Sequence, residues 1–448
     1  MKIIRDLEAA KTLLLGRSTV EFAEALPAVK QRIREIFDED MTPEEAVRRI
    51  VNDVRSRGDH ALFDLSKKID GMGLAQFEVT KGEIAESYKK VEKGLVSALQ
   101  LAAERIQAFH TTQLKKLGLG FVEGGMGFRV SPLERVGVYI PGGRAYYPST
   151  VLMTVIPAKV AGVAEVVIAT PPAPDGMVPA PTLVAADIAK ANHVFKVGGA
   201  QAIAAMAYGT KSIHKVDKIC GPGNIFVTLA KKQVYGTVAI DGLHGPTETV
   251  IIADDTANPA FCAADLLAQA EHDEMASAIL ITTSSHLAEQ VSEEVKQQLT
   301  KLGRRAIAWQ ALEQNGGIVL VTNMDEAIQL VNMYAPEHLC LMVKNARSYL
   351  DRIHHAGGIF IGAPEAIGDY VAGPSHVMPT GRTARFSSPL SVLDFLKVSI
   401  LIEMDDKALK LLGPAAATIA RAEGLTAHAI SVEKRLEQLG VIKEEGGK

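Results

Sequence analysis

A glutamine and a histidine, Gln269 and His272, stand three residues apart at the end of an apolar run with helical spacing. Residues three apart share one face of a helix, so the amide oxygen and the imidazole could converge on one metal ion. A solvated helix face or a simple hydrogen-bonded pair is the alternative. The rest of the chain must supply further ligands if a metal site exists.

A second candidate is the adjacent pair Glu337 and His338, which stands between a predicted helix over residues 327–333 and a predicted strand. A carboxylate and an imidazole have pKa values that a protein can tune toward neutrality, so the pair could transfer protons. The alternative is a surface loop with two ordinary polar residues.

Further donors are Asp369, just beyond a predicted strand, and Glu423 and His428, between two predicted terminal helices. An N-cap by Thr426 is the alternative for that last segment. Oxygen and nitrogen atoms from Gln269, His272, Asp369 and His428 would suit Zn²⁺. Spacing alone does not join residues so far apart in the chain.

Three glycine-containing turns follow predicted strands, at residues 139–143, 198–201 and 221–224. Parallel α/β sheets bind ligands at the carboxyl ends of their strands, where such turns lie. None of the three has the G-x-G-x-x-G spacing of the standard dinucleotide fingerprint. Each could be structural, but three in one domain favour a ligand cleft.

Regular elements must position these groups. The first 130 residues are predicted to be mostly helical, with a capped start at Thr42-Pro43 and one long amphipathic helix over residues 84–117. Strands alternating with helices then predict an open parallel sheet, and a second series follows. The predicted strands are 136–140, 165–170, 193–197 and 216–219, then 249–253, 278–282, 317–321, 339–343 and 358–361.

The fold class predicted is therefore α/β, with two Rossmann-like parallel-sheet domains and small helical segments at both ends. The strand–helix–strand units over residues 138–166 and 250–279 have the same order and similar length, which indicates an internal duplication. The chain is predicted to end in helices near residues 406–423 and 428–439.

The composition excludes several classes of function. The chain of 448 residues carries 48 Lys and Arg against 52 Asp and Glu, with no long basic block, which argues against nucleic acid as a partner. No uninterrupted apolar stretch predicts a membrane span, and the acidic start does not resemble a secretory peptide. The three cysteines lack metal or disulfide spacing, so we expect a cytoplasmic protein with buried thiols.

Taken together, the motifs resemble the histidinol dehydrogenase family over nearly the whole chain from about residue 40. The most specific matches are residues 138–143, 198–203, 216–224, 269–272, 334–339 and 383–390. The resemblance implies a homodimeric enzyme that binds Zn²⁺ and NAD and oxidises a small polar alcohol, with the C-terminal segment of one subunit completing the site of the other.

The resemblance also implies roles for individual residues. The zinc ligands would be Gln269, His272, Asp369 and His428. The acid/base pair would be Glu337 and His338. The residues that contact NAD would be Tyr139, Gln201 and Asn224. Substrate would meet Thr247, His376 and Glu423 together with Gln269, His272, His338, Asp369 and His428.

The domains expected on this basis start with an N-terminal arm over residues 1–23. Residues 24–138 would form a helical part and the first portion of one α/β domain, and residues 139–246 would form the second α/β domain, on the NAD side. Residues 247–385 would complete the first α/β domain and carry the metal and acid/base residues. Residues 386–448 would form a helical tail at a dimer interface.

The implied reaction is the four-electron oxidation of L-histidinol to L-histidine through bound histidinal, with two NAD⁺. Three positions depart from the family pattern: His244 stands where Ala is usual, Thr247 where Ser is usual and Ser375 where Asn is usual. Because of these three positions, a family member that oxidises a different small polar alcohol remains an alternative. A catalytically silent α/β binding protein is the third possibility, although every metal and acid/base position is filled.

Overall fold

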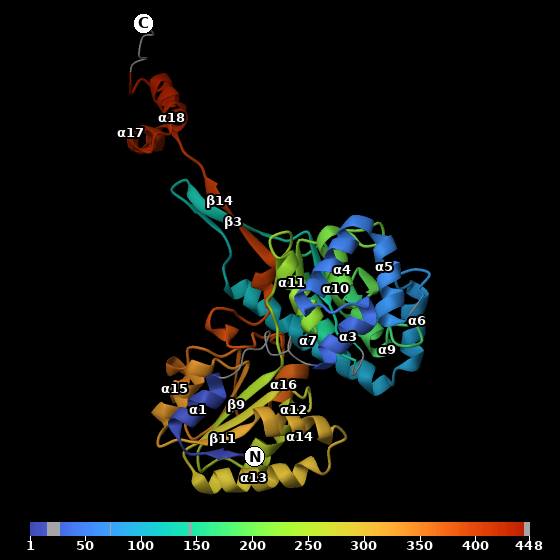
Figure 1. The fold of residues 1–448 in the computed structure, drawn as a ribbon. Helices are drawn as coiled ribbons and strands as arrows, with labels where there is room; N and C mark the ends of the chain where they lie inside the picture. The colour runs from blue at the N-terminus through green and yellow to red at the C-terminus, as the bar shows by residue number, and fades with distance from the viewer. Residues whose placement is uncertain (16–26, 72, 143–145, 443–448) are drawn as a thin grey trace. The chain divides into compact units, whose positions relative to one another are not determined.

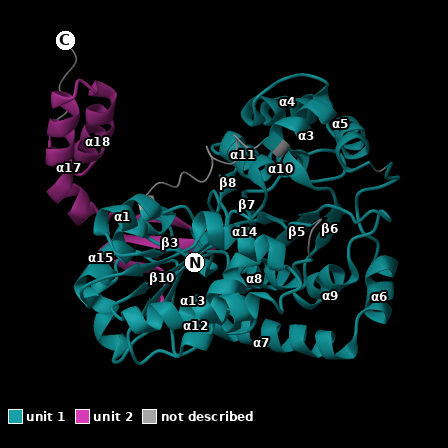
Figure 2. Cartoon of the chain, turned by 60° about the horizontal axis from the view of Figure 1, so that its bottom comes forward, with its two compact units in different colours: residues 1–116, 132–395 teal, residues 117–131, 396–448 magenta. Residues whose placement is uncertain are grey.

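The computed structural model describes residues 1–15, 27–71, 73–142 and 146–442, with the side chains of residues 15 and 28 excepted. The chain divides into two units (Figure 2): residues 1–116 with 132–395 form unit 1, and residues 117–131 with 396–448 form unit 2. Part of the predicted N-terminal arm and residues 143 and 144 of the first glycine-containing turn lie outside the described residues.

Unit 1 contains two parallel sheets (Figure 1). The first, here sheet B, has the order β6-β5-β4-β7-β8 and joins β4 (Arg135–Tyr139), β5 (Glu165–Thr170), β6 (His193–Lys196), β7 (Lys218–Cys220) and β8 (Ala239–Ile240). Its strands read as continuous apolar runs because helices cover both faces.

The second, sheet A, has the order β1-β11-β10-β9-β12-β13. It joins β1 (Ile3–Ile4), β9 (Glu248–Ala253), β10 (Ser277–Thr282), β11 (Gly317–Leu320), β12 (His338–Met342) and β13 (Gly358–Ile361), all in parallel. Counted from its first α/β strand, each sheet has the order third, second, first, fourth, fifth. This shared order matches the predicted duplication, and β1 adds one strand from the start of the chain.

Helices cover both faces of each sheet. The helices α10 (Gly199–Tyr208) and α11 (Ile225–Val234) pack on sheet B with α4 (Pro43–Arg57) and α5 (Asp59–Leu65) outside them. On sheet A, α12 (Pro259–Ala270), α13 (Ser285–Leu299) and α14 (Arg305–Asn315) lie on one face, and α1 (Leu7–Leu15) and α15 (Met324–Tyr334) on the other. The remaining helices of unit 1 are α3 (Pro27–Phe37), η1 (Ser66–Asp70), α6 (Lys81–Lys90), α7 (Lys93–Lys116), α8 (Pro148–Ala161), α9 (Ala180–Ile188), η2 (Ala346–Arg352), α16 (Glu365–Tyr370), η3 (Thr383–Arg385) and η4 (Val392–Phe395).

Unit 2 is a small α+β body. Its sheet has the order β14-β3-β2, formed by β2 (Phe121–Glu123), β3 (Met126–Pro132) and β14 (Leu396–Ile402), and its helices α17 (Asp406–Ala422) and α18 (Thr426–Gln438) pack on each other. The sequence interpretation had placed only helices after residue 385, so β14 was missed.

The predicted helix over residues 84–117 is wrong as a single element. It is two helices, α6 and α7, separated at Val91, whose backbone is extended and whose side chain is buried. Thr80 and Glu83 form a capping box at the start of α6, which ends the preceding loop and fixes the entry of the helix. No helix in the described part of the chain is long and apolar enough to cross a bilayer.

Candidate active site

The helix α12 delivers Gln269 from its last turn. Asn258 caps its start and Pro259 occupies the first helical position, while Glu271 is already the C-cap. His272 therefore lies just past the helix, in a turn where its backbone amide donates to the Gln269 carbonyl at 3.2 Å. The prediction that Gln269 and His272 stand on one helix is therefore wrong for His272, which the turn joins to the end of α12.

Gln269 belongs to a buried hydrogen-bonded cluster at the amino ends of β9 and β12. The Thr247 hydroxyl lies 2.9 Å from Gln269 Oε1 and 2.6 Å from Glu337 Oε2, and the Glu248 amide donates to the same Glu337 oxygen at 3.0 Å. Gln269 is 1% exposed and Glu337 7%. The cluster thus joins a proposed metal ligand to one member of the proposed acid/base pair.

His338 is buried beside this cluster, with its ring stacked on Phe360 at 5.6 Å between centroids. Its Nδ1 lies 3.3 Å from the Glu248 carbonyl oxygen and its Nε2 lies 3.2 Å from Asp369 Oδ1. Both oxygens are acceptors, so both ring nitrogens donate and the ring is protonated in this arrangement. Burial by itself lowers the pKa of His338, but the Glu337 and Asp369 carboxylates overcome this and raise it well above its ordinary value.

Asp369 lies on α16, which follows β13 and returns along the sheet toward the amino end of β12. Burial raises the pKa of Asp369, but the hydrogen bond and charge of His338 outweigh burial and lower it below its ordinary value. The charges of His376 and His272 act in the same direction on the pKa of Asp369.

His376 is hydrogen bonded to the backbone of Asp369. Its Nδ1 donates to the Asp369 carbonyl at 2.7 Å, and its Nε2 therefore accepts from the Thr150 hydroxyl at 3.1 Å. Burial lowers the pKa of His376, so this ring is neutral at neutral pH. The predicted substrate neighbour is thus also a tie between α8 and α16.

The predicted metal donors in unit 1 are the Gln269 amide oxygen, the Asp369 carboxylate and the His272 imidazole. Among the residues that the structure describes, no cluster of three or more His, Cys, Asp or Glu side chains is placed to hold a metal. Besides Gln269, unit 1 supplies only two such side chains to the predicted ligand set, His272 and Asp369, so a four-ligand zinc site would need a further donor.

Glu423 and His428, the remaining predicted residues, lie in unit 2. Glu423 is the C-cap of α17, and His428 is in the first turn of α18. Thr426 is the first residue of α18 and makes no capping bond through its side chain, so the N-cap alternative is wrong.

The three glycine-containing turns converge at the carboxyl ends of sheet B. The Tyr139 hydroxyl accepts from the Gly199 amide at 3.0 Å, which joins the first turn to the second. Gly221, with φ +107°, lies against the first turn, since a Cβ there would be 2.2 Å from the Tyr139 carbonyl oxygen. Burial raises the pKa of Tyr139 to about 12.

At this edge of sheet B, one buried amide has no hydrogen-bond partner among the described residues. Gln201 is fully buried, and both polar atoms of its amide lack a hydrogen-bond partner. Buried amides are normally paired, so Gln201 is a side chain at this edge whose hydrogen-bonding capacity is unused. Asn224 is exposed and uses its Oδ1 to cap α11, accepting from Phe226 and Val227 amides at 3.1 and 3.2 Å.

The residues that depart from the family pattern have local partners. The His244 ring bridges the Met378 carbonyl at 3.1 Å and Asp241 Oδ2 at 3.2 Å, so it points into a buried polar network. The Ser375 hydroxyl donates to the Met153 carbonyl at 3.1 Å. Thr247 keeps the hydroxyl that both Gln269 and Glu337 use.

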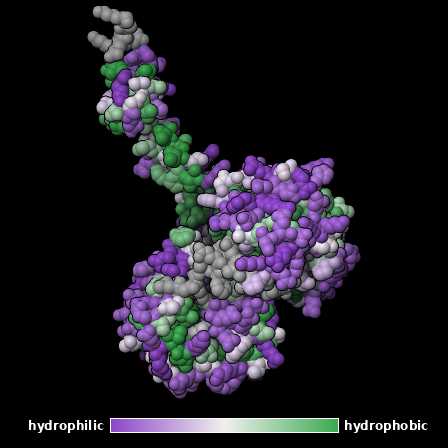
Figure 3. All heavy atoms as spheres, viewed as in Figure 1, coloured by the Kyte–Doolittle hydropathy of each residue, from purple (hydrophilic) through white to green (hydrophobic). Residues whose placement is uncertain are grey.

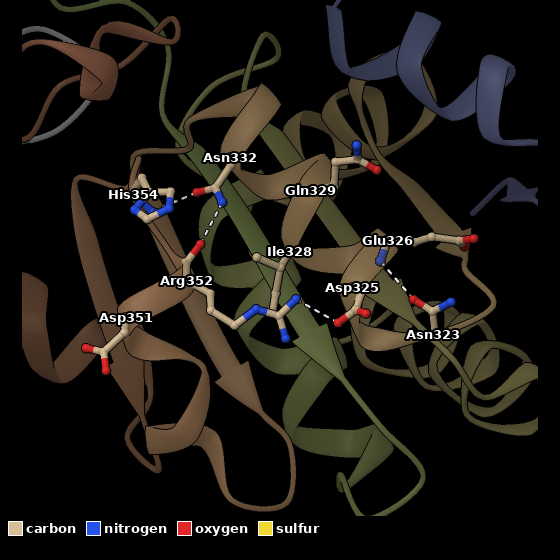
Figure 4. A pocket seen from close by; sticks show the side chains of 9 residues that line it. All are labelled: Asn323, Asp325, Glu326, Ile328, Gln329, Asn332, Asp351, Arg352 and His354. Atoms are coloured by element: carbon tan, nitrogen blue, oxygen red, sulfur yellow. Dashed lines mark hydrogen bonds and ion pairs between the residues drawn. The ribbon is translucent and has the colours of Figure 1, made fainter.

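A separate pocket on unit 1 carries none of these residues (Figure 4). Several of its polar groups pair within the pocket: Arg352 pairs with Asp325 at 2.6 Å, and Asn332 donates to the Arg352 carbonyl at 2.7 Å. The pocket lining is Asn323, Asp325, Glu326, Ile328, Gln329, Asn332, Asp351, Arg352 and His354. We therefore assign it no ligand.

Sequence analysis missed two buried groups beside the site. Glu365 accepts a hydrogen bond from Gln269, and Asp241 forms an ion pair with Lys231 under the third turn. Glu365 stands four residues before Asp369, a spacing that places both on one helix face and could have drawn attention to it.

Comparison with known proteins gives a consistent result. The family model for histidinol dehydrogenase matches residues 34–436. Proteins named histidinol dehydrogenase from Dehalococcoides mccartyi (strain CBDB1) and Deinococcus radiodurans are 52% and 48% identical, each over 98% of this chain and 100% of the relative. The crystal structure of histidinol dehydrogenase from Elizabethkingia anophelis has a TM-score of 0.85 at 38% identity, covering 93% of this chain and 97% of that one. The chain therefore belongs to the histidinol dehydrogenase family of NAD-dependent oxidoreductases.

Proposed function

We propose that the protein oxidises L-histidinol to L-histidine through bound histidinal, with zinc and two NAD⁺. Family membership supports the reaction type. The observation that carries the assignment to this site is the buried cluster in which Thr247, Gln269 and Glu337 are hydrogen bonded beside His338 and Asp369.

Zinc would be held by Gln269, His272, Asp369 and His428, and when bound it would orient the nitrogen atoms of the substrate. The chemistry of the donors supports this, since amide and carboxylate oxygens and imidazole nitrogens are ligands that zinc accepts. His428 is the donor that unit 2 would add.

His338 is proposed as the base that takes the hydroxyl proton of the alcohol and later that of the hydrated aldehyde. Its Nδ1–H is held by the Glu248 carbonyl, so the proton that the base would take up and release is the one on Nε2, which faces Asp369 in this arrangement. Glu337 would activate the water that hydrates the aldehyde, with its carboxylate held by Thr247 and the Glu248 amide. Burial of both groups limits access of bulk water to the aldehyde.

NAD, which accepts the hydride in each of the two steps, would bind at the carboxyl edge of sheet B. Tyr139, Gln201 and Asn224 are the proposed contacts. The unpartnered amide of Gln201 and the close approach of the three turns support this assignment. Substrate is proposed to meet Thr247, His376 and Glu423 in addition to the metal ligands and His338.

A homodimer with shared sites is part of the proposal. Unit 2 exposes apolar side chains over β14 and its helices, which Figure 3 shows as hydrophobic surface, among them Val398 (63% exposed), Ile400 (80%), Ile402 (66%) and Leu411 (77%). Exposed apolar surface on this scale is typical of an interface. His428 and Glu423 would then reach the partner's site.

The test is the stoichiometry of NADH formed per L-histidinol consumed, measured against other amino alcohols and diols. We expect two NADH per histidinol, loss of turnover after chelation and recovery with Zn²⁺. One NADH per substrate, or faster turnover of another alcohol, would contradict the assignment. Of the three residues that depart from the family pattern, His244 and Ser375 are bonded neither to the proposed ligands nor to the acid/base pair, whereas Thr247 keeps the hydroxyl that contacts Gln269 and Glu337.

A further inference from the structure

Glu365 is a carboxylate in the interior of unit 1 that neither the proposed zinc ligands nor the acid/base pair include. It is 1% exposed and is the first residue of α16. A buried carboxylate needs compensating hydrogen bonds, and Glu365 has three from side chains. Its Oε1 accepts from the Thr249 hydroxyl and, at 3.0 Å, from the Cys340 thiol; its Oε2 accepts from Gln269 Nε2 at 2.8 Å.

The bond to Gln269 decides which end of that amide faces the site. A glutamine side chain has an oxygen that can bind a metal and an NH₂ group that cannot, and a half-turn exchanges them. An ionised carboxylate only accepts, so Glu365 holds the NH₂ group on its own side. Gln269 Oε1 is thereby directed to the opposite side, where Thr247 and Glu337 lie.

Glu365 also joins the two elements that carry proposed ligands from unit 1. Glu365 and Asp369 are four residues apart on α16, while Gln269 is on α12. Thr249 on β9 and Cys340 on β12 donate hydrogen bonds to the Glu365 carboxylate and hold it against sheet A. The separation of Gln269 from Asp369 is therefore set through Glu365.

We propose that Glu365 is a positioning residue for the metal site: it orients the Gln269 carbonyl toward the ion and ties α12 to α16. This inference rests on the proposed zinc site. Residues that hold metal ligands in place typically change metal affinity about 10- to 100-fold when removed.

The experiment compares zinc affinity by chelator competition, with the visible spectrum of the Co²⁺-loaded protein as a second readout. Glu365→Leu removes the acceptor, so we expect zinc affinity to fall by about 10- to 100-fold and the Co²⁺ spectrum to change. Glu365→Gln can still accept from the Gln269 NH₂ group and should lose less. Glu83→Leu, which removes a half-buried glutamate paired with Lys196, is the matched control and should leave zinc affinity unchanged.

An exchanged pair separates orientation from stability. Gln269→Glu makes both oxygens equivalent but places two carboxylates in contact, so alone it should weaken zinc binding. Combined with Glu365→Gln, the hydrogen bond is restored with the carboxylate on the metal side, and zinc affinity should rise above that of Gln269→Glu alone. This comparison remains informative if Glu365→Leu does not fold.

Two results overturn the inference alone: wild-type zinc affinity in Glu365→Leu, or an exchanged pair that binds zinc no better than Gln269→Glu. Failure of the wild-type protein to bind zinc is a different result, because it removes the proposed zinc site itself.

Discussion

The hydroxyl of Thr247 connects two residues of the proposed site. It lies within hydrogen-bond distance of both Gln269 and Glu337, and its methyl group makes neither contact. Thr247→Val should lower kcat/KM by about 10- to 100-fold, because a hydrogen bond to a charged group contributes about 1.5–3 kcal/mol. Thr247→Ser keeps the hydroxyl and should stay within about threefold of the wild-type value on the same scale. Steady-state kinetics with L-histidinol compare the two variants, and a loss in Thr247→Ser as large as that in Thr247→Val would show that the hydroxyl is not the deciding group.

Asp70 gives a prediction about pH. Burial raises the pKa of this carboxyl from 3.8 to about 6, and its Oδ2 has no hydrogen-bond partner. The folded state therefore binds more protons than the unfolded chain between these values, and stability falls as pH rises through this window. Above about pH 6 the charged carboxylate destabilises the fold by no more than about 3 kcal/mol.

Asp70→Asn removes that charge. The variant should exceed the wild type in urea midpoint at pH 8 and match it near pH 4, where the wild-type Asp70 is already protonated in the folded state. Asp64→Asn, on an exposed carboxylate paired with Arg57, is the control and should show no such difference between the two pH values. A variant with the same stability as the wild type at pH 8 would refute the effect.

At the scale of elements, Lys231 fixes α11 to the chain that leaves β8. Its ammonium pairs with Asp241 and donates to the Gly221 carbonyl at 3.0 Å, and both side chains of the pair are at most 3% exposed. Asp241 also accepts from the Gly221 amide at 2.7 Å. The third turn of the proposed NAD site is therefore held by this pair.

Lys231→Met should cost about 3–5 kcal/mol of unfolding free energy, because it leaves Asp241 charged, buried and without its cation. Its exposed neighbour offers the comparison: Lys232→Met, which breaks only a 3.5 Å pair with Glu44, should change stability by less than about 1 kcal/mol. Urea denaturation measures both. A loss at Lys231 no larger than that at Lys232 would mean that the buried pair contributes little.

Much of the element order was predictable, because buried parallel strands are short apolar runs between glycine-containing turns. The start of α6 carried a signal that was missed, the capping box of Thr80 and Glu83. The exposed alternation of Val398, Ile400 and Ile402 in β14 was a strand signal too. Helical composition on both sides masked it.

The site was less predictable than the fold. Glu337 and His338 are neighbours in sequence, but Asp369 reaches His338 only because α16 turns back along sheet A. No local pattern contains that return, so the resemblance to a family was needed to name Asp369. Glu365 lay outside the family's named residues, and only the hydrogen bonds identify it.

At the scale of the whole molecule, the proposed sharing of sites between subunits predicts complementation. His338→Asn and His428→Asn should each be inactive alone. Co-expressed, they should form mixed dimers in which one site has both native histidines, with activity of about a quarter of wild type for random pairing. If both histidines act within one subunit, the mixture stays inactive, so NADH formation by the co-purified protein decides between the two arrangements.

The two sheets share a strand order but offer opposite edges to the proposed chemistry. Sheet B uses the carboxyl edge, at Tyr139 and the turns after β6 and β7, whereas sheet A uses the amino edge, at Thr247, Glu337 and His338. The carboxyl edge of sheet A, with its loops over residues 254–258 and 343–345, therefore carries none of the proposed site residues, unlike the carboxyl edge of sheet B. For protein engineering, those loops are the place on unit 1 to graft a reporter peptide or a surface anchor, because the graft would stand at the far end of the strands from every proposed ligand on sheet A.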